Sequence, residues 1–199
     1  QFILRAKALA GYECDGKRCP YDYPTQRQML MKALDMTHPN FDLEKIERCL
    51  LSIEDMKSLN QIAITYSETG ERRFAIRIYE QLLRYTKRRL FNNEALFSVL
   101  PMLCYNYSRL LGRERRYEEC IEIAQYGYDL SLKYDKARAL GGLLLNIGCS
   151  LQKLGKDEEA KKKLMESYYA FVTVKKFNSA QKVKDYMKEV FEIEFKGDI

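Results

Sequence analysis

The side chains with the clearest capacity for chemistry are three amides, Gln61, Asn106 and Asn146, which take the same position in three similar stretches of the sequence. An amide carries both hydrogen-bond donors and an acceptor, so it can hold the backbone of an extended peptide. An amide can equally tie two neighbouring helices together, because buried amides are usually satisfied within the protein. Both roles stay open for these three residues.

Basic residues follow two of these amides at helical spacing. Arg109 and Arg113 stand three and seven positions after Asn106, and Lys153 stands seven positions after Asn146. Positions i, i+3 and i+7 share one face of a helix. We expect a face that combines amides with cations and suits a peptide carrying a carboxylate, from an acidic residue or a chain terminus. The alternative is that the basic side chains are only solvated.

Enzymatic chemistry finds little support in the sequence. The single histidine, His38, stands beside Pro39 and is expected to be a turn residue rather than a base. The chain contains no HExxH, no GxSxG and no phosphate-binding GxxxxGK[ST] motif. The carboxylates are expected on helix surfaces, one turn away from Lys and Arg. We expect a protein that is not an enzyme and that uses no cofactor.

Six cysteines raise the question of disulfides and metals. Four of them stand singly within apolar stretches: Cys49, Cys104, Cys120 and Cys149. A free cysteine behaves there as a small buried hydrophobe. Cys14 and Cys19 are close enough in sequence to pair, but no second Cys or His pair accompanies them to complete a zinc site. The pattern favours a reduced, cytoplasmic setting and no metal.

The 199 residues, 46% of them hydrophobic, can bury a substantial core. Lys and Arg number 34 against 28 Asp and Glu, a net charge of +6, with the two signs interspersed along the chain. We expect the densest basic spots, Lys87-Arg88-Arg89 and Lys161-Lys162-Lys163, to be solvated faces rather than a nucleic-acid site.

No apolar run approaches the roughly 18 residues of a membrane span. No leader pattern follows Gln1, which is expected to begin a piece of a longer protein.

A period of 3.6 residues runs through almost the whole chain, and strand-like alternation is nearly absent. The sequence therefore predicts an all-α protein of about ten helices. We expect them at 2–14, 23–36, 41–52, 54–69, 72–90, 94–112, 117–134, 137–154, 157–175 and 177–192. Ser52 and Asp55 form a capping-box pattern that starts a helix near residue 53. Gly70 and Gly155 supply left-handed positions at which helices commonly end.

Short links between long helices make neighbours antiparallel, so the sequence predicts a stack of helix hairpins. Small residues recur where paired helices would cross: Ala63, Ser108 and Gly148 on first helices, and Ala75, Cys120 and Ala160 on second helices. This is a tetratricopeptide-like pattern, with repeat spacings of 45 and 40 residues in place of the usual 34 or so. We expect one right-handed solenoid domain over 1–199, with degenerate helices at 1–52, repeats at 53–91, 94–134 and 137–175, and a capping helix at 177–192.

Two stretches resemble a known family. They are the run Thr37 to Ile46 (THPNFDLEKI) and the run Tyr105 to Arg109 (YNYSR), the latter followed by RYEECIEIA from Arg116. The chain is similar there to the tetratricopeptide region of Firmicute transcription regulators that carry an XRE-type helix-turn-helix domain ahead of a helical repeat domain. These regulators are close to the Rgg/PlcR (RRNPP) group of peptide-pheromone receptors.

The resemblance implies a cytoplasmic sensor in which a short signalling peptide lies in a concave groove, held by asparagines of successive first helices. Asn106 and Asn146 match that role, and Gln61 is a longer substitute. It also implies a homodimer and a DNA-binding domain that would precede Gln1, so that DNA is met only through that domain. A second hypothesis is a protein-interaction adaptor that holds a partner protein and has no part in DNA binding.

Overall fold

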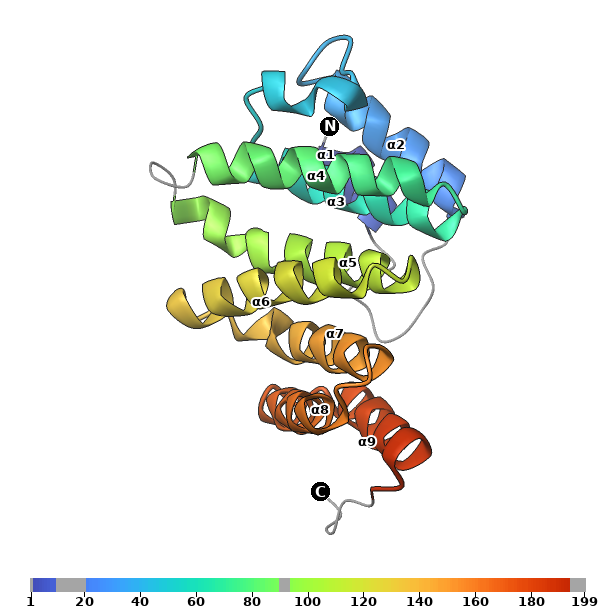
Figure 1. Cartoon of the computed structure of the whole chain (residues 1–199). Helices are drawn as coiled ribbons and strands as arrows, with labels where there is room; N and C mark the ends of the chain where they lie inside the picture. Colours follow the sequence, from blue (N-terminus) through green and yellow to red (C-terminus); the bar gives the residue numbers. More distant parts are fainter. Residues whose placement is uncertain (1, 10–20, 90–93, 194–199) are drawn as a thin grey trace. The chain divides into compact units, whose positions relative to one another are not determined.

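A computed structural model describes residues 2–9, 21–89 and 94–193 (Figure 1). The described residues are helical and contain no strand, which confirms the all-α prediction. Spatial proximity divides the chain into two compact units, Gln1–Val99 and Leu100–Ile199, and each is described by itself. A single domain over 1–199 stays a prediction. Cys14, Cys19 and the expected end of the first helix at residue 14 lie outside the described residues.

The first unit contains the helices α1 (Phe2–Leu9), α2 (Tyr23–Asp35), α3 (Ile53–Glu68) and α4 (Arg72–Arg89), and the 3₁₀ turns η1 (Leu43–Arg48) and η3 (Glu94–Ser98). Helices α3 and α4 form a hairpin, α2 packs on α3, α1 packs on α2, and η1 lies against α4 (Figure 1). Leu30 and Leu34 of α2 and Leu59 and Ile62 of α3 have no exposed surface. Their spacing gives each helix one apolar stripe that faces the core of this unit.

Helix α3 begins at the capping box that the sequence predicts. The Ser52 hydroxyl oxygen accepts a hydrogen bond from the Asp55 backbone N–H at 3.1 Å, and the Asp55 carboxylate accepts one from the Ser52 N–H at 2.9 Å. An N-cap residue has an extended backbone, and Ser52 has a ψ of 167°. The segment before α3 therefore cannot be helical up to residue 52.

The predicted helix at 41–52 is accordingly wrong, and only the turn η1 forms there. Lys45 interrupts it with non-helical angles, and the extended Cys49 ends it. The Gln81 side chain of α4 supplies hydrogen bonds in place of a helical ladder. Its Oε1 accepts from the Ile46 N–H at 3.0 Å, and its Nε2 donates to the Leu43 carbonyl at 2.8 Å. A tertiary contact thus outweighs the helical periodicity of this stretch.

The second unit contains α5 (Leu100–Arg113), α6 (Tyr117–Lys133), the 3₁₀ turn η4 (Ala137–Ala139), α7 (Leu140–Lys153), α8 (Asp157–Thr173) and α9 (Phe177–Phe191). Helices α5 and α6 pair, α7 and α8 pair, and α7 also contacts α5 and α6. The predicted helices 94–112 and 137–154 each begin with a short 3₁₀ turn before the α-helix. Pro101 explains the first break, because a proline is tolerated only in the first turn of a helix.

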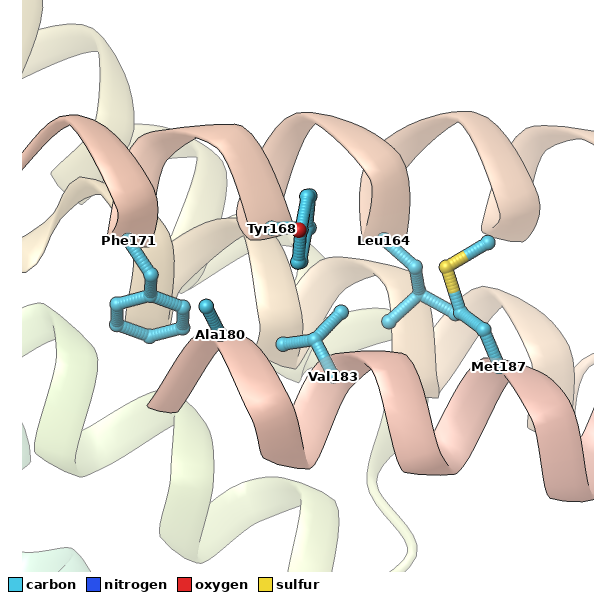
Figure 2. Packing of buried hydrophobic residues seen from close by; sticks show 6 residues of the cluster. All are labelled: Leu164, Tyr168, Phe171, Ala180, Val183 and Met187. Atoms are coloured by element: carbon cyan, nitrogen blue, oxygen red, sulfur yellow. The ribbon is translucent and has the colours of Figure 1, made fainter. Parts of the chain in front are cut away.

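Helix α9 closes this unit by packing on α8, as expected for the helix at 177–192. Figure 2 shows Leu164, Tyr168 and Phe171 of α8 facing the small and flexible side chains of α9. Those are Ala180, Val183 and Met187, all buried. Burying side chains of the size of Val183 or Met187 contributes about 1.5–3 kcal/mol each.

The predicted small-residue crossings are confirmed. Ala63, Ala75, Ser108 and Ala160 have no exposed surface, and Cys120 has almost none. A Cβ atom added at Gly148 would lie 2.7 Å from Cγ of Leu164, a separation that real Cβ atoms do not reach. Helices α7 and α8 therefore approach as closely as the absence of a side chain permits.

The four helices α5 to α8 end at a regular interval. Residues 115, 135, 155 and 175 all have a left-handed backbone, with φ of 60° at Arg115, 54° at Asp135, 76° at Gly155 and 58° at Lys175. After each one, a backbone N–H bonds a carbonyl five residues earlier, as when the N–H of Lys156 donates to Leu151 at 3.0 Å. One helix with its turn thus takes 20 residues, which accounts for the 40-residue repeat seen in the sequence. The expectation for Gly70 and Gly155 is also confirmed.

The left-handed residues other than glycine predict stabilising substitutions. We expect Arg115→Gly and Lys175→Gly each to raise the free energy of unfolding by about 0.5–1 kcal/mol, because glycine adopts a positive φ without steric cost. The matched control is Gly155→Ala, which we expect to lower it by about 1 kcal/mol. A Cβ at Gly155 would meet no atom within 4 Å, so only the backbone conformation is tested there. Urea unfolding followed by circular dichroism measures all three, and a loss of stability in both glycine variants would contradict the assignment.

Candidate functional site

Five of the six predicted site residues lie on two adjacent helices of the second unit. Asn106, Arg109 and Arg113 belong to α5, and Asn146 and Lys153 belong to α7. The two asparagines are half-buried, and the three basic side chains are exposed. We call this set the α5–α7 face.

Asn146 is held by two hydrogen bonds across this face. Its Nδ2 donates to the Tyr105 carbonyl at 3.0 Å and to the Ser108 hydroxyl at 2.8 Å. Ser108 in turn donates to the same Tyr105 carbonyl at 3.1 Å. The Asn146 side chain therefore lies beside the backbone of the residue that precedes Asn106.

The amide of Asn146 thus ties α7 to α5, which is the second of the two roles that the sequence left open. The role also restricts what Asn146 can offer to a ligand. Both of its amide hydrogens are engaged inside the protein, while its Oδ1 accepts no hydrogen bond from any described residue. An oxygen with this freedom can accept an N–H from a bound molecule.

Gly142 allows this arrangement by letting α5 lie close to α7. A Cβ atom at Gly142 would stand 2.5 Å from Cε2 of Tyr105, so the tyrosine ring rests directly on the backbone of α7. The same residue, Tyr105, supplies the carbonyl that Asn146 binds. The packing of the Tyr105 ring against Gly142 therefore determines where the Asn146 amide lies relative to α5.

Three further residues lie beside the α5–α7 face, Cys149, Gln152 and Tyr186, and nothing in the sequence indicated the last two. The Tyr186 hydroxyl of α9 donates to Oε1 of Gln152 on α7 at 3.3 Å. Burial raises the pKa of the Cys149 thiol to about 11, a rise that the neighbouring Tyr186 hydroxyl partly offsets. A thiol with such a pKa stays protonated at neutral pH and is not a nucleophile. Cys149 shares a face with Asn146 by its i, i+3 spacing, but no sequence signal brings α9 to that place.

Gln61, the sixth predicted residue, belongs to the first unit and is buried there. Its Nε2 donates to Oε1 of Gln26 on α2 at 3.3 Å, and Gln26 donates to the Tyr21 carbonyl at 2.8 Å. This chain of amides ties α3 to α2. A role of Gln61 in holding a peptide stays a prediction.

The first unit also brings together a serine, a histidine and an aspartate. His38 Nε2 lies 3.2 Å from Oδ2 of Asp55, and the Ser52 hydroxyl donates to the same oxygen at 2.7 Å. The serine is bonded to the carboxylate and not to the imidazole, so no base stands ready to take its proton. Arg5 of α1 forms an ion pair with the other carboxylate oxygen. The group joins α1, the end of α2 and the start of α3.

Asp55 is almost fully buried, and its charge is held by these partners. Burial alone would raise the pKa of Asp55. The hydrogen bonds from Ser52, His38 and Arg5 outweigh burial, so the pKa lies below its ordinary value. A lowered pKa means that the folded protein stabilises the ionised carboxylate.

Within the described ranges, no three His, Cys, Asp or Glu side chains gather in a way that could hold a metal ion. The same part of the chain has no helix that is both long enough and apolar enough to cross a bilayer.

The hairpins, their small-residue crossings and the regular helix ends define a helical repeat protein of the tetratricopeptide type. The model of the RNPP family C-terminal domain matches residues 36–191, and the chain belongs to this family. Comparison with curated proteins finds no match.

Two solved structures share the fold. The first is PlcR from Bacillus thuringiensis in complex with the peptide PapR7 and DNA, with a TM-score of 0.72 and 22% sequence identity. The alignment covers 92% of this chain and 59% of that one, so this chain spans about three fifths of the PlcR chain. The second is PlcR in its apo form, with a TM-score of 0.59, 19% identity, and coverage of 92% and 70%. At these identities the likeness establishes the fold.

The buried Asp55 group predicts a strong loss of stability on neutralisation. We expect Asp55→Asn to lower the free energy of unfolding by about 3 kcal/mol at pH 7, because it leaves the Arg5 charge buried without its partner. The control is Asp22→Asn at the exposed N-cap of α2, where Asn caps about as well as Asp and the change should stay within about 0.5 kcal/mol. Urea unfolding of both variants measures the difference.

The lowered pKa fixes how this difference depends on pH. Asp55 contributes fully above the carboxylate's unfolded pKa of about 4, and the contribution disappears as pH falls through the lower folded pKa. The gap in stability between the wild type and Asp55→Asn should therefore narrow below about pH 4. A gap that stays constant from neutral to acidic pH would mean that the ionised carboxylate is not the stabilising form.

Proposed function

We propose that this chain is the ligand-sensing and dimerisation domain of a cytoplasmic transcription regulator, and that it binds a short signalling peptide. The observation that carries the proposal is the match of residues 36–191 to the RNPP family C-terminal domain. A relative of the same fold, PlcR, has been solved in complex with the peptide PapR7 and DNA. The activity proposed here is regulatory binding and not catalysis.

The α5–α7 face is the proposed peptide site. With its amide hydrogens engaged by α5, Asn146 would accept a backbone N–H of the peptide through Oδ1. Asn106, on the neighbouring helix, would contact the same extended backbone. Arg109, Arg113 and Lys153, all exposed, would attract a carboxylate of the peptide. A peptide held in this way has a fixed direction, since the cations lie toward the C-terminal ends of α5 and α7.

Control of DNA would come from a helix-turn-helix domain encoded ahead of Gln1. The test is to sequence the gene upstream of the Gln1 codon, where we expect roughly 60 or more residues with that pattern. The proposed homodimer is tested by sedimentation of this chain with and without peptide. A gene in which a start codon directly precedes Gln1 would remove the transcription proposal.

Peptide binding to the α5–α7 face predicts a ligand-dependent rise in melting temperature. The short-peptide fraction of the native producer's culture medium should stabilise the chain, by about 2.7 kcal/mol at a hundredfold excess over Kd. Asn106→Ala combined with Asn146→Ala should abolish the rise, and Asn178→Ala, on the exposed surface of α9, should preserve it. Since Asn146→Ala also removes two internal hydrogen bonds, it should lower the unliganded stability by about 1–3 kcal/mol.

A second double variant separates binding from stability. Arg109→Gln with Arg113→Gln changes only exposed side chains, and it should weaken the response while leaving the unliganded melting temperature almost unchanged. If both double variants fold and respond like the wild type, the peptide does not bind at this face.

An interaction adaptor of the tetratricopeptide type is the alternative. It would capture a folded cytoplasmic protein instead of a free peptide, and its gene would encode no DNA-binding domain. The upstream sequence and the peptide melting experiment therefore discriminate between the two functions.

A further inference from the structure

Helix α4 concentrates the positive charge of the whole chain. It carries seven basic residues: Arg72, Arg73, Arg77, Arg84, Lys87, Arg88 and Arg89. With Glu80 as its one acidic residue, α4 has a net charge of +6, equal to that of all 199 residues. The expectation that positive and negative residues are interspersed along the whole chain is therefore wrong for α4. The seven basic side chains are all exposed.

A cavity of about 610 Å³ lies between this helix and the turn η1. Leu43, Phe74 and Ile78 form its apolar lining. Phe74 is 45% exposed, so part of its side chain is accessible to a partner. Its ring stacks on Tyr66 with centroids 5.7 Å apart, so it is held in place before any partner arrives.

Arginines line the same cavity and are only partly neutralised. Arg84 and Arg88 both pair with Glu47, at 2.6 and 2.9 Å, and Arg77 pairs with Glu44 at 3.0 Å. These arginine side chains are more than half exposed, so their ion pairs are weak and easily exchanged for others. Because η1 contains two acids and two bases, it leaves the net charge of α4 uncancelled.

We propose that the cavity between η1 and α4 is a docking site for an acidic segment of another protein, one with a large apolar side chain between carboxylates. The apolar side chain would enter beside Phe74 and Ile78, and the carboxylates would bind Arg77, Arg84 and Arg88. This surface lies wholly in the first unit, on residues other than those of the α5–α7 face, and the proposal does not depend on the proposed function.

The lining favours a protein over a nucleic acid. Nucleic-acid backbones carry a phosphate at every nucleotide and offer no apolar side chain for the cavity. The carboxylates of Glu44 and Glu47 lie among the arginines and would repel a continuous row of phosphates. A peptide can place its carboxylates selectively, and it gains affinity by burying an apolar anchor.

The test measures binding of a fluorescein-labelled peptide, Asp-Asp-Glu-Phe-Asp-Glu-Leu-Asp, to the whole chain by fluorescence anisotropy. Arg84→Gln with Arg88→Gln should weaken binding roughly fivefold or more, because two charge-assisted contacts are lost. Replacing the peptide's Phe by Ala should also weaken it roughly fivefold or more, because the anchor is removed. Lys162→Gln with Lys182→Gln, two exposed lysines of the second unit, should match the wild type.

Three results would overturn the proposal. One is equal weakening by the arginine and lysine pairs, which would indicate unspecific charge attraction. Another is insensitivity to the Phe-to-Ala change, which would mean that the apolar cavity is unused. The third is tighter binding of random-sequence duplex DNA with the same dependence on Arg84 and Arg88. If the Arg84→Gln, Arg88→Gln variant disturbs η1, the binding of the Phe-to-Ala peptide to the wild-type protein still tests whether the cavity holds an apolar side chain.

Discussion

The close contact of α7 with α5 is the constraint on which the α5–α7 face depends. Gly142 lets the Tyr105 ring lie on the backbone of α7, and only at this separation can Asn146 reach the Tyr105 carbonyl and Ser108. Amide hydrogens that are satisfied across the helix pair leave the amide oxygen as the group available to a ligand. Helix packing therefore determines the position of Asn146, and it also determines that its amide oxygen, rather than its amide hydrogens, can bind a ligand.

In the first unit, buried polar and charged side chains hold the elements together. There the buried carboxylate of Asp55 binds Ser52, His38 and Arg5. The Gln81 side chain of α4 forms two hydrogen bonds with the backbone of η1 and so holds this turn on α4. Because η1 is a short turn and not a helix, it leaves a cavity beside α4 instead of filling that side. The two units thus carry chemically distinct surfaces. One presents amides and a few cations, and the other presents apolar side chains among arginines.

Much of the fold could be predicted from the sequence because its determinants are local. Periodicity predicted the long helices to within a few residues, and the Ser52 capping box located the start of α3. The errors lie where a distant residue intervenes. The hydrogen bonds of Gln81 favour a 3₁₀ turn in place of the predicted helix at 41–52. The sequence also did not indicate the left-handed backbone at Arg115, Asp135 and Lys175, because these residues are not glycine. For Lys175, which joins α8 to α9, burial of the two helices against each other offsets the local cost of the left-handed backbone.

The sequence by itself determined the all-α class, the hairpin crossings and the register that places Asn106 and Asn146 alike, because spacing and side-chain size are properties of the chain. Tertiary structure alone decided what these residues face. Gln61 shares the register, yet it is buried against Gln26, while Asn146 is half-buried and donates its hydrogen bonds to α5. Cys149 and Tyr186, 37 positions apart, meet only because α9 folds back near α7. Hydrogen-bond partners far apart in sequence follow from packing, which no local pattern encodes.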